Sequence, residues 1–315
     1  MKFIKLCVFF SLFTSPIVNA KSAVSYHFSG GRLGDNLLSY SHARWIAYRY
    51  NMPFFYRPFE YSDQFMMHIK ETHLTNDIVS TFDQVVNVNL DNVGEIDPEK
   101  NILYIIPFFS ESIRERTNPR CPFLFSVDWE DQCFKNLLQE MISPNCIIEP
   151  SCKRDDCLSV ALHIRVGTGF DIKGLDDYWW IMTQSWVELK FPPFSFYLRA
   201  LELLYNLHPE KKLYVYLFTD HTDAHELAQI FIEKFKGKNI IFDYRRTENR
   251  HDLNVISDFF ELTSFDCLIR SDSNFAMMAS KVSTYVMQIS PWHIDHSTDI
   301  AFVDEVCIDN NIIKW

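Results

Sequence analysis

The second half of the chain alternates between strand-like and helix-like segments, and this alternation constrains the fold more than any other feature. Four apolar runs predict buried strands, at 158–166, 212–220, 239–244 and 266–272. Four segments with helical spacing lie between or after them, at 194–207, 223–235, 254–265 and 273–282. Strands that alternate with helices form βαβ units and a parallel sheet. We therefore expect an α/β fold with its ligand site beyond the carboxyl ends of the strands.

The first half predicts a second sheet. Its strand-like segments are 23–28, 85–90 and 102–109. Residues 36–51 have helical spacing, which places four side chains on one face: Leu37, Ser41, Trp45 and Tyr48. Residues 110–157 are rich in Pro, Cys and charge, and they predict an irregular inter-lobe region with a short helix near 131–142. A chain of this length is sufficient for two lobes, which we place at 21–150 and 151–315.

Residues 1–20 have the pattern of a secretory signal peptide. Lys2 and Lys5 precede an apolar run over 6–13, and Ala20 ends a small-residue cleavage pattern. The run is short for a membrane span, although a retained anchor is the alternative. We find no other long apolar segment, so we expect a soluble mature chain that is secreted, periplasmic or in the lumen of the secretory pathway.

Seven of the eight cysteines follow the signal, and five of them lie between 121 and 157. Export makes disulfides plausible in this segment, and a zinc site is the alternative. The absence of a C-x-x-C pair favours disulfides. The net charge of −11 disfavours a nucleic-acid binder.

A glycine-rich turn precedes the first predicted helix. Three of only 8 glycines in the chain, Gly30, Gly31 and Gly34, fall within five positions. Glycine permits positive φ and close approach to the backbone, so a ligand at a helix N-terminus would suit this turn. An ordinary tight strand-to-helix turn is equally consistent with it.

Polar residues gather at the predicted carboxyl ends of three strands. They are His163, Arg165 and Gly167, then Thr219 and Asp220, then Ser271, Asp272, Ser273 and Asn274. An arginine at the end of a buried strand must be paired, either with a structural carboxylate or with a phosphate. Ser273 and Asn274 begin a helix, where they cap it or help to bind a phosphate. Together with the acceptors Asp220 and Asp258, these residues indicate a nucleotide-diphosphate pocket.

Two other kinds of site are less well supported. The chain has no Walker A loop and no G-x-G-x-x-G, which disfavours an NTPase or a dinucleotide enzyme. His221 and His225 are four residues apart and raise the possibility of a metal site. Acidic residues at the start of the same helix are explained by the helix dipole without a ligand. We therefore predict no metal and no bound cofactor.

The order of these motifs resembles the fucosyltransferase superfamily. Gly31-Arg32-Leu33-Gly34 resembles the G-R-x-G-N loop of the protein O-fucosyltransferases, and His163-Ile-Arg165-Val-Gly167 resembles the H-I-R-R-G-D motif of the α-1,2 enzymes. The segment from Asp258 to Phe275 resembles their D…N-S-S-F-S-W-W segment. Asp35, Val166, Thr168 and Ala276-Met277-Met278 depart from these patterns.

The resemblance implies a GT-B architecture, with two Rossmann-like lobes that face each other across a cleft. It implies GDP-fucose as donor, a glycan or protein hydroxyl as acceptor, inversion at the sugar carbon and no required metal. Arg165 would hold the β-phosphate with His163, Gly167, Ser273 and Asn274 around it. Asp258 would read guanine and Asp220 would lie near the nucleotide. Arg32, Gly34 and Asp35 would face the sugar and the acceptor from the N-terminal lobe.

Several alternatives stay open at this level. The general base would be Asp35 or one of Asp171, Asp176 and Asp177 in the loop after the arginine motif. Aromatic residues in that loop, Tyr178, Trp179, Trp180 and Trp186, suit either sugar stacking or a core. A GT-B transferase for another nucleotide sugar is a second function. A secreted binding protein that has lost turnover is a third, and the motif departures favour it.

Overall fold

The structure is a computed structural model of the chain. It describes residues 21–28, 30–89, 96–108, 127–148, 154, 156–165, 190–221, 223–250, 252–295, 300–308 and 311–314. The predicted signal peptide, residues 1–20, lies outside the described residues, so its assignment stays a prediction.

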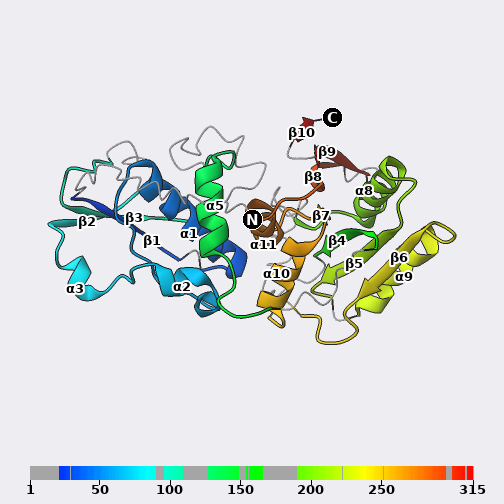
Figure 1. Cartoon of the computed structure of the whole chain (residues 1–315), viewed down its shortest axis with the longest axis horizontal. Helices are drawn as coiled ribbons and strands as arrows, with labels where there is room; N and C mark the ends of the chain where they lie inside the picture. The colour runs from blue at the N-terminus through cyan, green and yellow to red at the C-terminus, as the bar shows by residue number, and fades with distance from the viewer. Residues whose placement is uncertain are drawn as a thin grey trace, which may run out of the picture.

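The first lobe contains a small parallel sheet (Figure 1). Within the described residues its strands follow the order β1-β3-β2, with the bounds Ala23–Tyr26, Ile102–Ile106 and Gln84–Asn87. Helix α1 runs over Leu33–Arg49 and α5 over Gln132–Met141. Shorter helical segments connect these elements: η1 (Ser62–Gln64), α2 (Met66–Lys70) and α3 (Asn76–Val79). The strands and the short helix α5 predicted from the sequence are confirmed.

The second lobe contains a larger sheet with the order β10-β9-β8-β7-β4-β5-β6 in the part of the chain that is described. The strands predicted from the sequence are β4 (Leu158–Ile164), β5 (Leu213–Thr219), β6 (Ile240–Tyr244) and β7 (Cys267–Arg270), and they pair in parallel. The predicted helices are α8 (Phe194–Leu207), α9 (Ala224–Lys234), α10 (Val255–Ser264) and α11 (Asn274–Val282). The alternation therefore predicted these strands and helices correctly.

The C-terminal end of the sheet was not predicted from the sequence. Strand β8 (Met287–Asp295) pairs with β7 in parallel, while β9 (Ile300–Ile308) and β10 (Asn311–Lys314) complete the sheet in antiparallel pairing. Strand β8 follows α11 and pairs with β7 in parallel, so it continues the βαβ pattern and was missed all the same. Strands β9 and β10 follow β8 without an intervening helix, so they lack the pattern on which the prediction of the other strands rested.

Local side-chain chemistry fixes the starts of two helices. Asp131 accepts a hydrogen bond from the backbone N–H of Phe134 at 2.9 Å, and α5 begins at the next residue. Asp223 accepts from the N–H of Glu226 at 3.0 Å and caps α9 in the same way. An N-cap carboxylate satisfies an N–H group that has no partner inside the helix.

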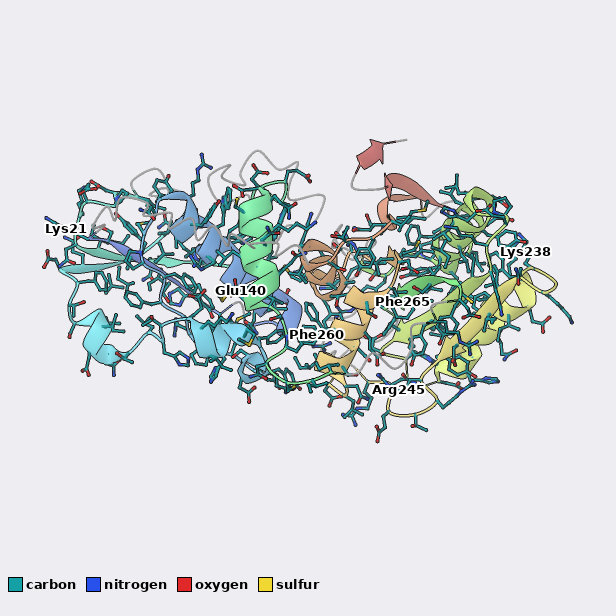
Figure 2. The ribbon with its side chains drawn as sticks, viewed as in Figure 1. Lys21, Glu140, Lys238, Arg245, Phe260 and Phe265 are labelled. Atoms are coloured by element: carbon teal, nitrogen blue, oxygen red, sulfur yellow. The ribbon has the colours of Figure 1, made fainter. Side chains whose placement is uncertain are left out.

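The two lobes share a hydrophobic core. One contiguous cluster of buried side chains combines residues of α1, α5 and β3 with residues of α10 and α11. Phe65 of the first lobe lies 6.0 Å from Phe259 and 5.4 Å from Phe260, measured between ring centroids. Figure 2 shows Phe260 on the side of α10 that faces the first lobe. The lobes are therefore joined by packing as well as by the chain.

Helix α1 is more deeply buried than the sequence pattern predicted. Leu37, Ser41 and Trp45 are buried as expected, while Tyr48, at 37% exposure, is the most open member of that face. Residues on its other faces are also buried, including Asn36 and Tyr40, because α1 packs against β1, α5 and α11 together. It also begins at Leu33, so the glycine-rich turn leads directly into its first turn.

Two further findings concern the apolar length of the helices and the state of the cysteines. Among the described residues, no helix is long and apolar enough to cross a bilayer. Four cysteines with described side chains, Cys133, Cys146, Cys157 and Cys267, are free thiols. Cys121 and Cys152 lie outside the described residues, so the disulfide prediction remains untested there.

Candidate active site

A cavity of about 500 Å³ lies where the turn before α1 meets the carboxyl edge of the second sheet. Its lining includes nine of the ten site residues predicted from the sequence: Arg32, Gly34, Asp35, His163, Arg165, Asp220, Asp258, Ser273 and Asn274. The tenth, Gly167, lies outside the described residues. Residues that are up to 242 positions apart, Arg32 and Asn274, thus surround one cavity at the edge where the strands of the second sheet end.

Arg165 is the cation that follows β4. Its Nε atom is buried and has no hydrogen-bond partner among the described residues. The guanidinium carbon lies 5.6 Å from the centre of the Phe191 ring, which supports it from one side. Burial lowers the pKa of Arg165, and the carboxylate of Asp220 opposes this shift. A buried guanidinium with an unused donor is suited to bind an anion that enters the cavity.

Lys190 is a second cation in the cavity, which the sequence analysis missed. It lines the cavity immediately before α8. Burial, with a further contribution from the positive charge of Arg165, lowers the pKa of its ammonium to about 8. The carboxylates of Asp35 and Asp272 oppose this shift. With Arg32, the cavity therefore holds three basic side chains near one another.

Asp35 joins the two lobes at the edge of the cavity. Its Oδ1 accepts a hydrogen bond from Asn274 Nδ2 at 2.6 Å, across 239 positions of sequence. Its Oδ2 accepts from the backbone N–H of Arg32 at 3.1 Å, which caps α1. The carboxylate predicted as a general base is thus held in a fixed orientation by both lobes. Each of its oxygens can accept one more hydrogen bond.

A different physical cause favours glycine at each of the three glycine positions in the turn. Gly30 has a φ of +75°, which favours glycine. A Cβ at Gly31 would lie 2.2 Å from Asp35 Oδ2, and a Cβ at Gly34 would lie 2.3 Å from the backbone nitrogen of Phe275. Gly34 therefore lets the N-terminus of α1 approach the N-terminus of α11. The sequence suggested that these glycines let a ligand approach the backbone closely. At Gly34 the group that approaches is the backbone of α11, so the contact is between two helices.

The N-terminus of α11 faces the same cavity. Ser273 is the N-cap residue, and its side chain makes no capping hydrogen bond. The side chain of Asn274 reaches Asp35 instead of capping its own helix. Because the first N–H groups of a helix have no intrahelical partners, this helix start provides donors and a positive dipole end. Of the two roles considered for these side chains, capping is therefore not observed.

His163 lies beneath these groups on β4. Its ring stacks on Phe275, with 6.0 Å between centroids, and its Nδ1 lies 3.4 Å from Ser271 Oγ. Burial lowers the pKa of His163 to about 4, against a smaller opposing effect of Asp220. The ring is therefore neutral at neutral pH and adds no charge to the cavity.

A second part of the lining, here called the apolar end, contributes three apolar side chains from β5 and from around the start of α10, beside charged residues. The three are Phe218, Leu253 and Val255, and Asp258 in the first turn of α10 lines the cavity with them. Asp258 forms a bidentate ion pair with Arg245, in which Nη1 lies 3.0 Å from Oδ2. Burial raises the pKa of Asp258, and the hydrogen bond from Arg245 opposes this shift. The ion pair fixes the plane of the carboxylate at this end.

Charged and aromatic residues of two loops line the cavity as well, and they were not predicted from the sequence. Glu60 and Tyr61 come from the first lobe, while Arg250 and Asp252 precede α10. Arg250 and Asp252 form an exposed bidentate pair at 2.6 and 3.0 Å. The run Arg245-Arg246 to Arg250 before a predicted helix was the available signal, because clustered arginines near a strand end often contact anions.

The candidate metal ligands do not converge in the described structure. Among the described residues, no group of three or more His, Cys, Asp or Glu side chains is arranged to hold a metal ion. His221 Nδ1 lies 2.9 Å from the carbonyl oxygen of Asp223, and His225 Nδ1 lies 2.6 Å from the hydroxyl of Tyr244. Each histidine thus has a local partner.

The loop after the arginine motif lies outside the described residues. The alternative bases Asp171, Asp176 and Asp177 belong to it, as do Tyr178, Trp179, Trp180 and Trp186. The departures Val166 and Thr168 are also in this loop. Their predicted roles therefore remain predictions.

Comparison with known proteins supports the fold. No family profile and no curated protein sequence matches the chain. Among solved structures, a mutant of FUT1 from Arabidopsis thaliana in complex with GDP aligns over 88% of this chain and 71% of that one, with 11% identity and a TM-score of 0.57. The fucosyltransferase NodZ from Bradyrhizobium aligns over 92% and 99%, with 12% identity and a TM-score of 0.50. The chain therefore has the α/β, GT-B-like fold of these fucosyltransferase structures.

Proposed function

We propose that the protein is a glycosyltransferase that moves fucose from GDP-fucose to a hydroxyl group of a glycan or protein. One observation carries this proposal: Arg165, Arg32 and Lys190 meet the N-terminus of α11 in one cavity at the carboxyl edge of the sheet. The fold is shared with a solved fucosyltransferase in complex with GDP. A cationic cavity in this position suits a nucleoside diphosphate.

The proposed chemistry depends on stabilising the departing GDP. When the bond to the sugar breaks, negative charge develops on the β-phosphate. The buried Nε of Arg165 and the free N–H groups at the start of α11 are fixed donors for that charge. Lys190 and Arg32 add positive charge nearby. In this proposal protein cations take the role that a divalent ion has in other nucleotide-sugar transferases.

The nucleoside would occupy the apolar end of the cavity. Phe218, Leu253 and Val255 offer surfaces for a flat base. Asp258, oriented by Arg245, offers carboxylate oxygens to the N–H groups of guanine. Asp220, after β5, would accept from a ribose hydroxyl. This placement keeps the diphosphate at the end with the three basic side chains.

Asp35 is the described candidate for the general base. It extends from the first lobe into the cavity, and Asn274 and the N–H of Arg32 fix its orientation. A carboxylate on the acceptor side that removes the hydroxyl proton would support direct attack on the sugar carbon with inversion. We further propose that residues 1–20 export the chain to the compartment where the acceptor is found.

The test is turnover of GDP-fucose by the mature chain, measured as release of GDP with and without a panel of glycan and peptide acceptors. Arg165→Ala should lower turnover by at least about 100-fold, because the lost donor acts on charge that forms in the transition state. Arg199→Ala, on the exposed side of α8, is the matched control and should keep wild-type turnover.

Two results would contradict the proposed function and favour one of its alternatives. Turnover of a uridine or adenosine sugar in preference to GDP-fucose would support a GT-B transferase with another donor. Binding of GDP with neither transfer nor hydrolysis would support a secreted binding protein on the same fold.

A further inference from the structure

Tyr61 has an unusual backbone conformation beside the cavity. Its φ is 65° and its ψ is −2°, at the N-cap of η1. The left-handed region is unfavourable for a residue with a bulky side chain. Such conformations persist where the surrounding structure enforces them, and they are concentrated at functional sites.

Contacts with the second lobe hold this turn in place. Tyr61 O accepts from the backbone N–H of Gln64 at 3.1 Å, which closes η1. Phe65, the residue after η1, is fully buried and packs against Phe259 and Phe260 of α10. The turn that carries Tyr61 is therefore anchored beside α10, although it belongs to the first lobe.

Tyr61 and the residues that begin α10 line the same cavity. Tyr61 lines the cavity with Glu60, and Asp252 and Leu253 from the loop before α10 line it as well. Burial raises the pKa of the Tyr61 phenol, and the carboxylates of Glu60 and Asp252 raise it further. Of these two carboxylates, Glu60 belongs to the first lobe and Asp252 to the second.

The two ends of the cavity differ in what they can bind. Strand order β7-β4-β5 sets the direction, with Ser273 after β7, Arg165 after β4 and Phe218 at the end of β5. Arg165 belongs to the β4 end, and Lys190 and Arg32 are close enough to influence its charge or be influenced by it, whereas Arg250 comes from the loop before α10. Phe218 belongs to the β5 end, which offers apolar surface and carboxylate acceptors. A nucleobase has two apolar faces and an edge of N–H donors, so it matches the β5 end.

We propose that Tyr61 stacks on the nucleobase of the donor and closes the base end of the cavity from the first lobe. The proposal rests on the proposed function, because it requires a nucleotide donor. It gives the first lobe a part in nucleotide recognition, in addition to its expected part in acceptor binding. It also gives the left-handed turn a purpose, since the turn holds an aromatic ring over the cavity.

The experiment measures the dissociation constants of GDP and of inorganic pyrophosphate for the full mature chain by calorimetry. Tyr61→Asn removes the ring and retains a residue that tolerates positive φ. Its GDP affinity should fall roughly tenfold or more, as expected for a lost aromatic–base stack, while its pyrophosphate affinity should not change. Tyr61→Phe should bind GDP more tightly than Tyr61→Asn, because it retains the ring.

Glu248→Gly is the matched control for backbone strain. Glu248 also has a positive φ, of 60°, and lies outside the cavity lining. Its substitution should leave both affinities at the wild-type values. Equal losses of GDP and pyrophosphate affinity in Tyr61→Asn would overturn the stacking role, as would an unchanged GDP affinity. Failure of the wild-type chain to bind GDP would overturn the proposed function together with this inference.

Discussion

Burial opposes the charge of two cations in the cavity, Arg165 and Lys190. The pKa of Arg165 starts so high that it stays charged at any physiological pH, whereas burial lowers the pKa of Lys190 to about 8. Lys190 is therefore the basic side chain of the cavity whose charge depends on pH near neutrality. A diphosphate would favour its charged form.

The pH dependence of GDP binding tests the role of Lys190. Below pH 8 the ammonium is mostly protonated in the free protein and contributes to binding. Above pH 8 the free protein must take up a proton to bind, so affinity should fall by up to about tenfold per pH unit. Calorimetry from pH 7 to 9 measures this decrease. Lys190→Arg retains its charge and should show a much weaker pH dependence; identical profiles for both proteins would contradict the role.

Some residues of the cavity could be identified from the sequence and others could not. Arg165 and Asp220 were identified because they follow apolar strands, and strand ends meet at one sheet edge. Lys190 and Tyr61 were missed because they lie in connecting segments without a period to place them. The hydrogen bond between Asp35 and Asn274 was missed because no local pattern links residues 239 positions apart.

At the scale of elements, the contact between α1 and α11 organises the cavity. Gly34 allows it, because a Cβ there would lie 2.3 Å from a backbone nitrogen that cannot rotate away. Both helices then direct their N-termini toward the same space. The fold thus brings together two positive dipole ends from different lobes.

Gly34→Ala should destabilise the protein by about 1–3 kcal/mol, as overpacking does in other cores. The sign of this change in stability is informative, because without the contact alanine in a helix would be favoured over glycine by about 1 kcal/mol. Urea unfolding measures the change in free energy of unfolding. Gly31→Ala is the comparison, since the three atoms nearest to its Cβ belong to the Asp35 side chain, which can move only by giving up its hydrogen bonds to Asn274 and to the N–H of Arg32. A stabilised Gly34→Ala variant would refute the helix contact.

The hydrogen bond between Asp35 and Asn274 should couple the two helices energetically. In a double-mutant cycle of Asp35→Ala and Asn274→Ala, we expect a coupling of about 1–2 kcal/mol in the free energy of unfolding, as for hydrogen bonds to charged groups. The cycle cancels the separate loss of the α1 cap. Strict additivity of the two substitutions would show that the contact contributes nothing.

The elements themselves were largely predictable where strands and helices alternate. The predictions for β4 to α11 depended on apolar runs separated by helical spacing, and tertiary packing did not override them. Strand β8 continues that alternation after α11 and was missed all the same, whereas β9 and β10 lack it. The burial of α1 on several faces was also not predictable, because the helices that cover it come from the other end of the chain.

At the scale of the whole molecule, the shared core makes the lobes interdependent. Side chains of α10 and α11 belong to the same buried cluster as those of α1 and α5. The lobe boundary expected near residue 150 therefore divides the chain into two segments, but both segments contribute side chains to one core. Movement of one lobe against the other would have to disturb this packing.

A fragment of residues 21–150 should fail to fold alone, because it would expose the side of α1 that α11 covers and the surface of Phe65 that α10 covers. Circular dichroism with thermal unfolding is the measurement, and the full mature chain is the control. We expect no cooperative transition in the fragment. A cooperative transition in the fragment, with native-like strand and helix content, would contradict the shared core.

The central claim is that this cavity binds a guanosine diphosphate group through Arg165, and thermal shift with calorimetry on the mature chain tests it most directly. GDP should raise the melting temperature and UDP should raise it less, because a ligand that binds only the native state stabilises it. Arg165→Ala should lose at least about 30-fold in GDP affinity, which corresponds to about 2 kcal/mol. No GDP binding by the folded wild-type chain, or equal binding by Arg165→Ala, would contradict the account.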